Sequence, residues 1–283
     1  MLEHYSHEKE GNLLGEGSYG RVYGSHSGGR KFALKKFDRR AYGAFVHESE
    51  MALKTNSLQN VVQVKKSFIS GGNGYLLMEH CISDLFTFIK ERNEPLCEEE
   101  ALRIFYSLCE AVAELHSRSI AHLDLKLENI LLTEKGEWKL CDFGSSCSFT
   151  RGERKLVRGR IGTPGYAAPE IMANKWFFPE KADSWSLGII LHALLLNCLP
   201  YFDSESTDSS FSLNFVYFSS ISAASKKLLY NLLAHDPDVR PSAKYILLEY
   251  KYFQLQPPKA KETNTKFRKI KNLFKTKASS VLE

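Results

Sequence analysis

Short apolar runs separated by glycines fill the first part of the chain. Three runs lie within residues 13–37, and two more flank the glycine-rich segment 71–74. Runs of this kind bounded by turn residues predict strands and hairpins. Between them, residues 44–55 have the apolar spacing of a helix. We therefore expect a strand-rich region over residues 11–80.

Beyond residue 85, longer stretches with helical spacing replace the short runs. Residues 98–119 predict an amphipathic helix whose acidic first turn suits the positive end of the helix dipole. Two further helices are expected within 184–200 and 221–237. A strand-rich part followed by a helical part predicts an α+β fold. Two prolines, at 257–258, end the compact region before a Lys-rich tail.

Charge is distributed unevenly between the body and the tail. The 283 residues are 43% hydrophobic and 25% charged, which is ordinary globular composition. The formal net charge is +5, but residues 257–283 alone hold eight Lys or Arg against two acids. The rest of the chain is therefore close to neutral. Because a basic body is not indicated, we expect no specific nucleic-acid partner.

The cysteines and the apolar segments indicate in which cellular compartment the protein is expected. The six cysteines form no CxxC pair and no zinc-spaced cluster, which is typical of free thiols in a reducing compartment. The charged N-terminus lacks the apolar core of a signal peptide. The longest apolar run contains His192 and Asn197 and is short for a bilayer. We expect an intracellular protein, cytoplasmic or nuclear, with no transmembrane segment.

A glycine-rich motif, "GEGSYGRV", begins at Gly15. Tight turns explain most such motifs, and a dinucleotide site would need a helix directly afterwards. Here a strand, a turn and another strand follow, so the glycines lie in a hairpin where the backbone can approach phosphates. Lys35, in "FALK", lies inside the next apolar strand. A strand lysine can simply extend to the surface, but beside this hairpin it fits a phosphate-binding cation.

A buried lysine needs a carboxylate partner, and the following helix offers Glu48 and Glu50. These two residues face different sides of the helix. Glu48 is three residues from both Phe45 and Met51, which aligns it with the apolar face. We expect Glu48 to pair with Lys35 and Glu50 to lie at the surface.

The stretch "HLDLKLEN" is followed, thirteen residues after its Asn129, by Asp142 of "DFG". In isolation "DFG" would indicate a simple turn. Together with Asn129 it supplies oxygen ligands of the kind that hard cations such as magnesium prefer. Asp124 and Lys126 in the first stretch add a proton acceptor and a cation.

Six motifs in this order resemble the eukaryotic protein kinases of the serine/threonine branch. They are "GEGSYGRV", "FALK", "HLDLKLEN", "DFG", "GTPGYAAPE" (162–170) and "DSWSLG" (183–188). The resemblance covers about residues 9–253 and implies a bilobal fold, with an N-lobe over 9–80 and a C-lobe over 81–256. A basic tail, 257–283, follows. The layout is similar to that of the calcium/calmodulin-dependent and related kinases.

The resemblance implies ATP as phosphate donor, Mg²⁺ as cofactor, and serine or threonine hydroxyls of proteins as acceptors. It makes Asp124 the proton acceptor and Lys126 the cation that steadies the γ-phosphate. It makes Asn129 and Asp142 the metal ligands, with Lys35 on the α- and β-phosphates. The residues that it assigns to ATP binding are Leu14, Gly15, Glu16, Gly17, Ser18, Tyr19, Gly20, Val22, Ala33, Lys35, Glu48, Met78, Glu79, Cys81, Asp84 and Leu131.

Other residues carry expectations about substrate and scaffold. The resemblance implies that Thr163 and Glu128 contact the substrate, with Glu128 and Asp84 favouring a basic residue upstream of the phosphoacceptor. Cys141 would border the nucleotide or remain a core thiol. A second set is expected to be structural: Glu170 should pair with Arg240, and Asp183 should brace the backbone of the catalytic loop.

Two residues depart from the family pattern of control by phosphorylation. Leu123 stands where many related kinases carry an arginine that binds a phosphate on the activation segment, and leucine cannot bind one. Gly159, at a frequent phosphoacceptor position, has no hydroxyl. We expect an active kinase that is not switched by this route. The alternative is a catalytically silent, nucleotide-binding pseudokinase scaffold.

Two further segments raise questions of regulation. The stretch between Pro200 and Ile221 is shorter than the family usually has there. In the tail, apolar residues of 265–282 recur at three- and four-residue steps among basic ones. A solvated tail, an import signal and an anionic membrane contact all fit this pattern. The sharper hypothesis is a regulatory helix that an acidic, calmodulin-like partner withdraws.

Overall fold

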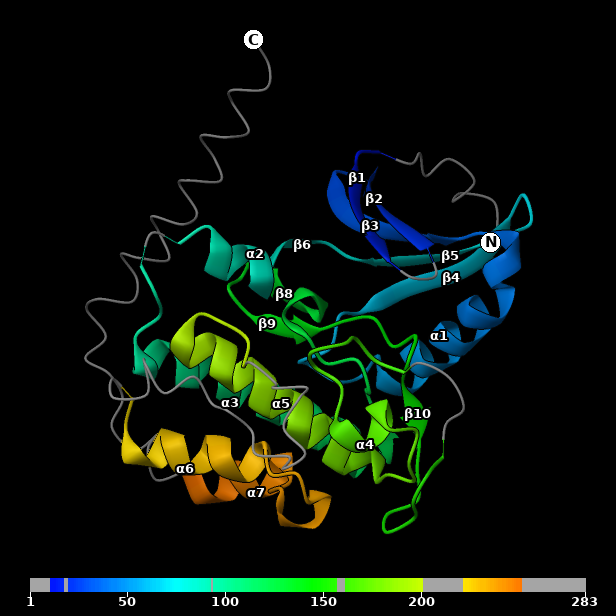
Figure 1. Cartoon of the computed structure of the whole chain (residues 1–283). Helices are drawn as coiled ribbons and strands as arrows, with labels where there is room; N and C mark the ends of the chain where they lie inside the picture. Colours follow the sequence, from blue (N-terminus) through cyan, green and yellow to red (C-terminus); the bar gives the residue numbers. More distant parts are fainter. Residues whose placement is uncertain (1–10, 18–19, 93, 157–160, 201–220, 251–283) are drawn as a thin grey trace.

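The computed structural model describes residues 11–17, 20–92, 94–156, 161–200 and 221–250. Strands gather at the N-terminal end and helices at the C-terminal end (Figure 1). Five strands form an antiparallel sheet in the order β1-β2-β3-β5-β4. Their bounds are β1 (Leu13–Gly17), β2 (Gly20–Ser27), β3 (Arg30–Phe37), β4 (Val64–Ser70) and β5 (Asn73–Glu79).

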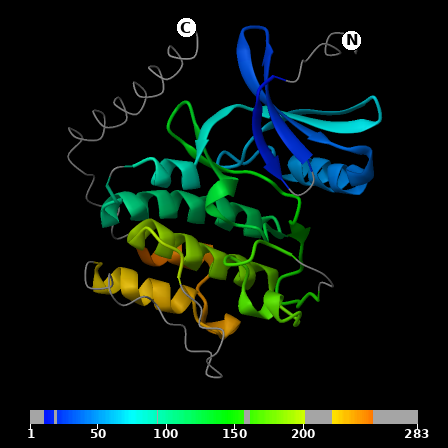
Figure 2. The same cartoon turned by 45° about the horizontal axis from the view of Figure 1, so that its top comes forward.

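Helix α1 (Tyr42–Thr55) packs against this sheet, as both views show (Figures 1 and 2). Its Phe45 joins Phe37 of β3 and Leu76 of β5 in a small apolar cluster. Glu48 is buried on the same helix, although burying a carboxylate is costly unless it is paired. The helix therefore carries one acidic side chain into the interior, beside β3.

The C-terminal part is built around two long helices, α3 (Glu98–Ser117) and α5 (Pro179–Leu196). Nearly every residue of α5 is buried, so this helix forms the centre of the larger core. The other α-helices in the described residues are α2 (Leu85–Lys90), α4 (Pro169–Met172), α6 (Ala223–Leu232) and α7 (Ala243–Tyr250). Short 3-10 helices lie at Arg39–Ala41, Leu127–Asn129 and Pro237–Val239.

Two small sheets lie between the main sheet and these helices. Strand β6 (Cys81–Asp84) pairs with β8 (Ile130–Thr133), which pairs with β9 (Trp138–Leu140). Strand β7 (Ile120–Ala121) pairs with β10 (Cys147–Ser148). Leu140 joins the two parts of the molecule, since its backbone bonds to Asn60 at 2.9 Å and Val62 at 2.8 Å.

The structure confirms the α+β, bilobal organisation with a strand-rich N-terminal part and a helical C-terminal part. The hairpins, α1, α3, α5 and α6 are present where the pattern predicts them. Helix α2 and strands β6 to β10 are too short to give a periodic signal of their own. The short segment 201–220 and the amphipathic stretch 265–282 lie entirely outside the described residues. None of the helices in the described ranges is long and apolar enough to cross a bilayer.

Candidate active site

Lys35 occupies the centre of a three-residue ion cluster. Its Nζ lies 2.7 and 2.8 Å from the two carboxylate oxygens of Glu48, and 2.9 Å from Oδ1 of Asp142. Lys35 and Glu48 are both almost fully buried, whereas Glu50 is exposed. The choice of Glu48 as the partner of Lys35 is therefore confirmed. The cluster joins β3, α1 and the segment after β9.

Mutual attraction stabilises the charges of Lys35 and Asp142, whereas at Glu48 burial outweighs it and raises the pKa of that carboxyl. Burial alone would lower the pKa of Lys35, but Glu48 and Asp142 outweigh it and raise that pKa above its ordinary value. Burial likewise opposes ionisation of Asp142, and the positive charge of Lys35 overcomes this and lowers the pKa of that carboxyl. At neutral pH Lys35 carries a positive charge and Asp142 a negative one.

Asp124 is the centre of a second polar cluster. Thr163 Oγ1 donates to Asp124 Oδ1 at 2.7 Å, and Lys126 Nζ lies 3.1 Å from Oδ2. Lys126 also donates to Thr163 Oγ1 at 2.9 Å. Asn129 Nδ2 donates to the backbone oxygen of Asp124 at 2.8 Å. The catalytic-loop residues and the threonine of "GTPGYAAPE" thus converge on one carboxylate.

Asp142 and Asn129 lie beside each other because the backbone N–H of Cys141 donates to Asn129 O at 3.0 Å. The amide nitrogen of Asn129 is turned to Asp124, which leaves its amide oxygen on the other side of the group. An amide oxygen and an ionised carboxylate fit the hard-cation chemistry of Mg²⁺, which takes few protein ligands and completes its shell with phosphate oxygens and water.

Asp183, at the start of the buried part of α5, braces the catalytic loop as expected. Its two oxygens accept from the backbone N–H groups of His122 at 2.9 Å and Leu123 at 2.8 Å. His116 Nε2 lies 2.8 Å from the same carboxylate. This histidine is an addition that sequence reasoning missed, because its position on α3 gives it no motif.

The backbone has left-handed φ values at two positions within the candidate active site. Leu123 has φ 62° and Asp142 has φ 63°, an arrangement that costs a non-glycine residue of order 1 kcal/mol or more. The side chain of Leu123 is buried in the large core. Opposite it, a Cβ on Gly162 would lie only 2.8 Å from Leu123 O, so the close approach requires glycine there.

The expected nucleotide slot is formed by the first three strands and their neighbours. In register, Val22 lies opposite Lys35, and Ala33 lies opposite Met78. Gly20 is required by the sheet itself, because a Cβ would lie 2.2 Å from Lys36 O. Gly15 and Gly17 meet no such obstruction, so their lack of a side chain leaves open space at the hairpin. Ser18 and Tyr19, at its tip, lie outside the described residues.

Two other residues predicted to line the nucleotide slot, Leu14 and Leu131, differ in exposure. Leu14 is half exposed and reaches toward Gly24 of β2, while Leu131 of β8 is partly buried opposite Lys139. Glu16, by contrast, forms a surface ion pair at 2.9 Å with Arg21 across the hairpin.

The end of β5 and the start of β6 hold the residues expected at the adenine edge, Glu79 and Cys81. The side chain of Glu79 is held by Lys139 at 2.8 Å and by the backbone N–H of Gln63 at 2.7 Å. Cys81 begins β6, and burial raises the pKa of its thiol to about 12. Burial also raises the pKa of the Cys141 thiol well above its ordinary value. Both cysteines are therefore protonated at neutral pH.

Asp84 has a structural task that the sequence did not reveal. It caps the N-terminus of α2: Oδ1 accepts from Thr87 N at 2.8 Å and Oδ2 from Thr87 Oγ1 at 2.7 Å. Both of its oxygens already have a donor. Glu128 is exposed on the catalytic loop, with Tyr166 nearby.

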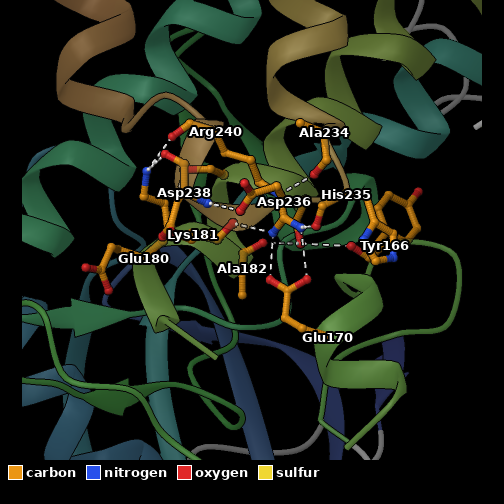
Figure 3. Close-up of polar contacts among 12 residues, drawn as sticks. Tyr166, Glu170, Glu180, Lys181, Ala182, Ala234, His235, Asp236, Asp238 and Arg240 are labelled. Atoms are coloured by element: carbon orange, nitrogen blue, oxygen red, sulfur yellow. Dashed lines mark hydrogen bonds and ion pairs between the residues drawn. The ribbon is translucent and has the colours of Figure 1, made fainter. Parts of the chain in front are cut away.

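The expected pair of Glu170 and Arg240 is present and buried. The guanidinium donates to the two carboxylate oxygens at 2.6 and 2.9 Å (Figure 3). It also donates to three backbone carbonyls, those of Ala234, Lys181 and His235. All five N–H donors of the arginine are therefore used. The pair fixes the "APE" helix α4 to the loop after α6, which supports its interpretation as scaffold.

Comparison with known proteins agrees with this geometry. The sequence-family model of the protein kinase domain matches residues 8–253 of this chain. The rice (Oryza sativa subsp. indica) serine/threonine protein kinase OSK3 is 32% identical over 261 residues, covering 88% of this chain and 50% of that protein. CBL-interacting serine/threonine-protein kinase 5 of Arabidopsis thaliana is 32% identical over 249 residues, covering 84% and 56%.

The chain therefore belongs to the protein kinase family, in its serine/threonine branch. It spans about half the length of the rice and Arabidopsis relatives that it matches. ATP and magnesium are typical of this family. The amide oxygen of Asn129 and the carboxylate of Asp142 fit a magnesium ion.

Proposed function

We propose that this chain is an active kinase that transfers the γ-phosphate of ATP to serine or threonine hydroxyls of proteins. The observation that carries the proposal is the simultaneous presence of both clusters, Lys35–Glu48–Asp142 and Asp124–Lys126–Thr163. Each is closed by contacts of 2.7 to 3.1 Å. The boundaries proposed for its two lobes are 9–80 and 81–256.

In this proposal each side chain has a role set by its surroundings. Asp124, fixed by Thr163 and Lys126, accepts the proton of the attacking hydroxyl. Lys126 also steadies the transferring phosphate, and Lys35 holds the α- and β-phosphates. Asn129 and Asp142 hold Mg²⁺, which when bound neutralises charge on the phosphate oxygens. Positioning and charge, rather than covalent chemistry, account for the rate.

A radiolabelled phosphotransfer assay tests the proposal. Purified protein is incubated with γ-labelled ATP, Mg²⁺ and a degenerate serine/threonine peptide library, with Asp142→Asn as the inactive control. We expect label on peptide with the natural chain and background label with the variant. ATP binding without any difference in labelling between the two proteins would instead support the pseudokinase scaffold.

Activity is expected without phosphate on the activation segment. Leu123 offers no cation for such a phosphate, and its side chain is buried among apolar residues. Gly159 lies outside the described residues but has no hydroxyl to phosphorylate. Protein treated with phosphatase, with phosphate removal verified by mass spectrometry, should keep most of its activity. A collapse that follows loss of phosphate from Ser146, Ser148 or Thr150 would contradict this.

Substrates are expected to carry Arg or Lys two or three positions before the phosphoacceptor. Glu128, which is exposed, and Asp84, which caps α2 but keeps acceptor sites on both carboxylate oxygens, are the carboxylates proposed to read it. On a peptide array, Glu128→Gln should reduce the preference for a basic residue several-fold, and Asp84→Asn should reduce it as well. An array with no upstream preference in the natural chain would refute the assignment.

The basic tail is proposed as a regulatory segment that an acidic partner withdraws. The names of two relatives describe them as CBL-interacting, which supports a regulatory partner for this chain. Truncation after Pro258 should raise basal activity, and a peptide of residues 265–282 should inhibit in trans. Equal activity of the full-length and truncated chains, at matched concentration and ATP, would exclude this inhibitory role.

A further inference from the structure

Glu48 reaches Lys35 only while helix α1 stays in place. Its neighbour on the helix, His47, makes a hydrogen bond to the C-terminal part of the molecule. His47 Nε2 lies 2.9 Å from the backbone oxygen of Ser146. A carbonyl oxygen can only accept, so the histidine donates. Neighbouring helix positions point in different directions. Glu48 therefore faces β3 while His47 faces the segment that follows Asp142.

The acceptor belongs to a turn that is closed by its own hydrogen bonds. Ser146 is buried, and both its backbone N–H and its Oγ donate to Phe143 O, at 3.1 and 2.6 Å. Phe143 is buried in turn, with its ring centroid 5.0 Å from that of His122. The oxygen that His47 contacts is therefore fixed relative to Asp142 and to the catalytic loop.

Met51 of α1 belongs to the larger core cluster, and other hydrogen bonds among the described residues join the end of α1 and the residues just after it to the C-terminal part. Lys54 Nζ donates to Ser148 Oγ at 3.3 Å, and Arg118 donates to Lys54 O at 3.0 Å and Ser57 Oγ at 2.7 Å. These contacts are exposed, so solvent competes for them. The histidine contact is partly buried and adjoins Glu48.

We propose that His47 is a positioning residue that holds α1 against the Asp142–Ser146 turn, so that the Lys35–Glu48 pair forms without a phosphate. The inference rests on the proposed function for its kinetic consequence, but not for its structural one. A hydrogen bond from a side chain to a backbone oxygen would thus hold α1 in place against the C-terminal part.

The test compares His47→Ala, His47→Gln and Glu50→Ala in the full chain. Glutamine keeps a side-chain N–H at similar reach, and Glu50 is an exposed residue of the same helix, so its change to alanine controls for helix propensity. Hydrogen exchange of residues 42–55 is measured by mass spectrometry, together with kcat, KM for ATP and thermal unfolding. Loss of one partly buried hydrogen bond shifts such an equilibrium by about two- to tenfold.

With His47→Ala we expect exchange in α1 to be about two- to tenfold faster and kcat to fall by a similar factor, without global unfolding at the assay temperature. His47→Gln should restore both, and Glu50→Ala should match the natural chain. Unchanged α1 exchange in His47→Ala, or equal losses in the alanine and glutamine variants, would overturn the inference. A natural chain without turnover would overturn the proposed function instead, and exchange would still decide the role of His47.

Discussion

Replacing Asp124 by asparagine is expected to lower phosphotransfer by about 10²–10⁴-fold while leaving ATP binding intact. The amide keeps the shape of the side chain but cannot take up the proton of the attacking hydroxyl. It also removes the negative charge 3.1 Å from Lys126 and one of the acceptors that fix Thr163 and Asn129. Initial rates with a peptide substrate measure the loss, and titration calorimetry with an ATP analogue measures binding.

A matched control for this variant is Asp38→Asn, an exposed aspartate that contacts neither cluster. Its rate should equal that of the natural chain. If Asp124→Asn phosphorylates the peptide at more than a tenth of the natural rate, then Asp124 is not the proton acceptor. If it also loses ATP binding, the carboxylate has a part in holding the nucleotide site that the contacts do not indicate.

Replacing Arg240 by leucine is expected to destabilise the fold by about 3–5 kcal/mol, because it leaves the carboxylate of Glu170 buried without its partner. Three backbone carbonyls lose their donor as well. For a chain of this size, the loss corresponds to a fall of roughly 6–20 °C in Tm. Thermal unfolding followed by circular dichroism checks it.

The control is Arg103→Leu, which breaks an exposed ion pair with Glu99 on α3. Pairs of that kind contribute less than about 1 kcal/mol. Adding Glu170→Leu to Arg240→Leu should recover part of the lost stability, since no buried charge then remains. A Tm for Arg240→Leu no lower than that of Arg103→Leu would show that the buried pair is not the structural support proposed here.

The ion pair of Lys35 and Glu48 can be predicted from the sequence, because the residues close to each partner in the chain identify it. The lysine lies in an apolar strand, and helical spacing places only one of two nearby glutamates on the buried face. The pair of Glu170 and Arg240 was accessible only through the family pattern, since 70 residues separate its members. Motif order supplied the tertiary information that periodicity lacks.

Other contacts could not be anticipated, because they depend on where segments without periodicity come to rest. Asp84, expected among the ATP-binding residues, also caps the six-residue helix α2, and a helix that short gives no periodic signal in the sequence. The bond of His47 ends on a backbone oxygen, and backbone acceptors leave no trace in side-chain identity. His116 joins Asp183 from a helix whose amphipathic pattern says nothing of that contact.

The burial of Leu123 also constrains how control of this protein can change over evolutionary time. A single mutation to arginine would carry an unpaired charge into a site that is only 4% exposed and is surrounded by apolar side chains. A phosphoacceptor would have to arise on the activation segment in a separate event, and neither change is useful alone. A phosphate switch at this loop would therefore require both changes together, whereas control that acts from outside the catalytic loop would require neither.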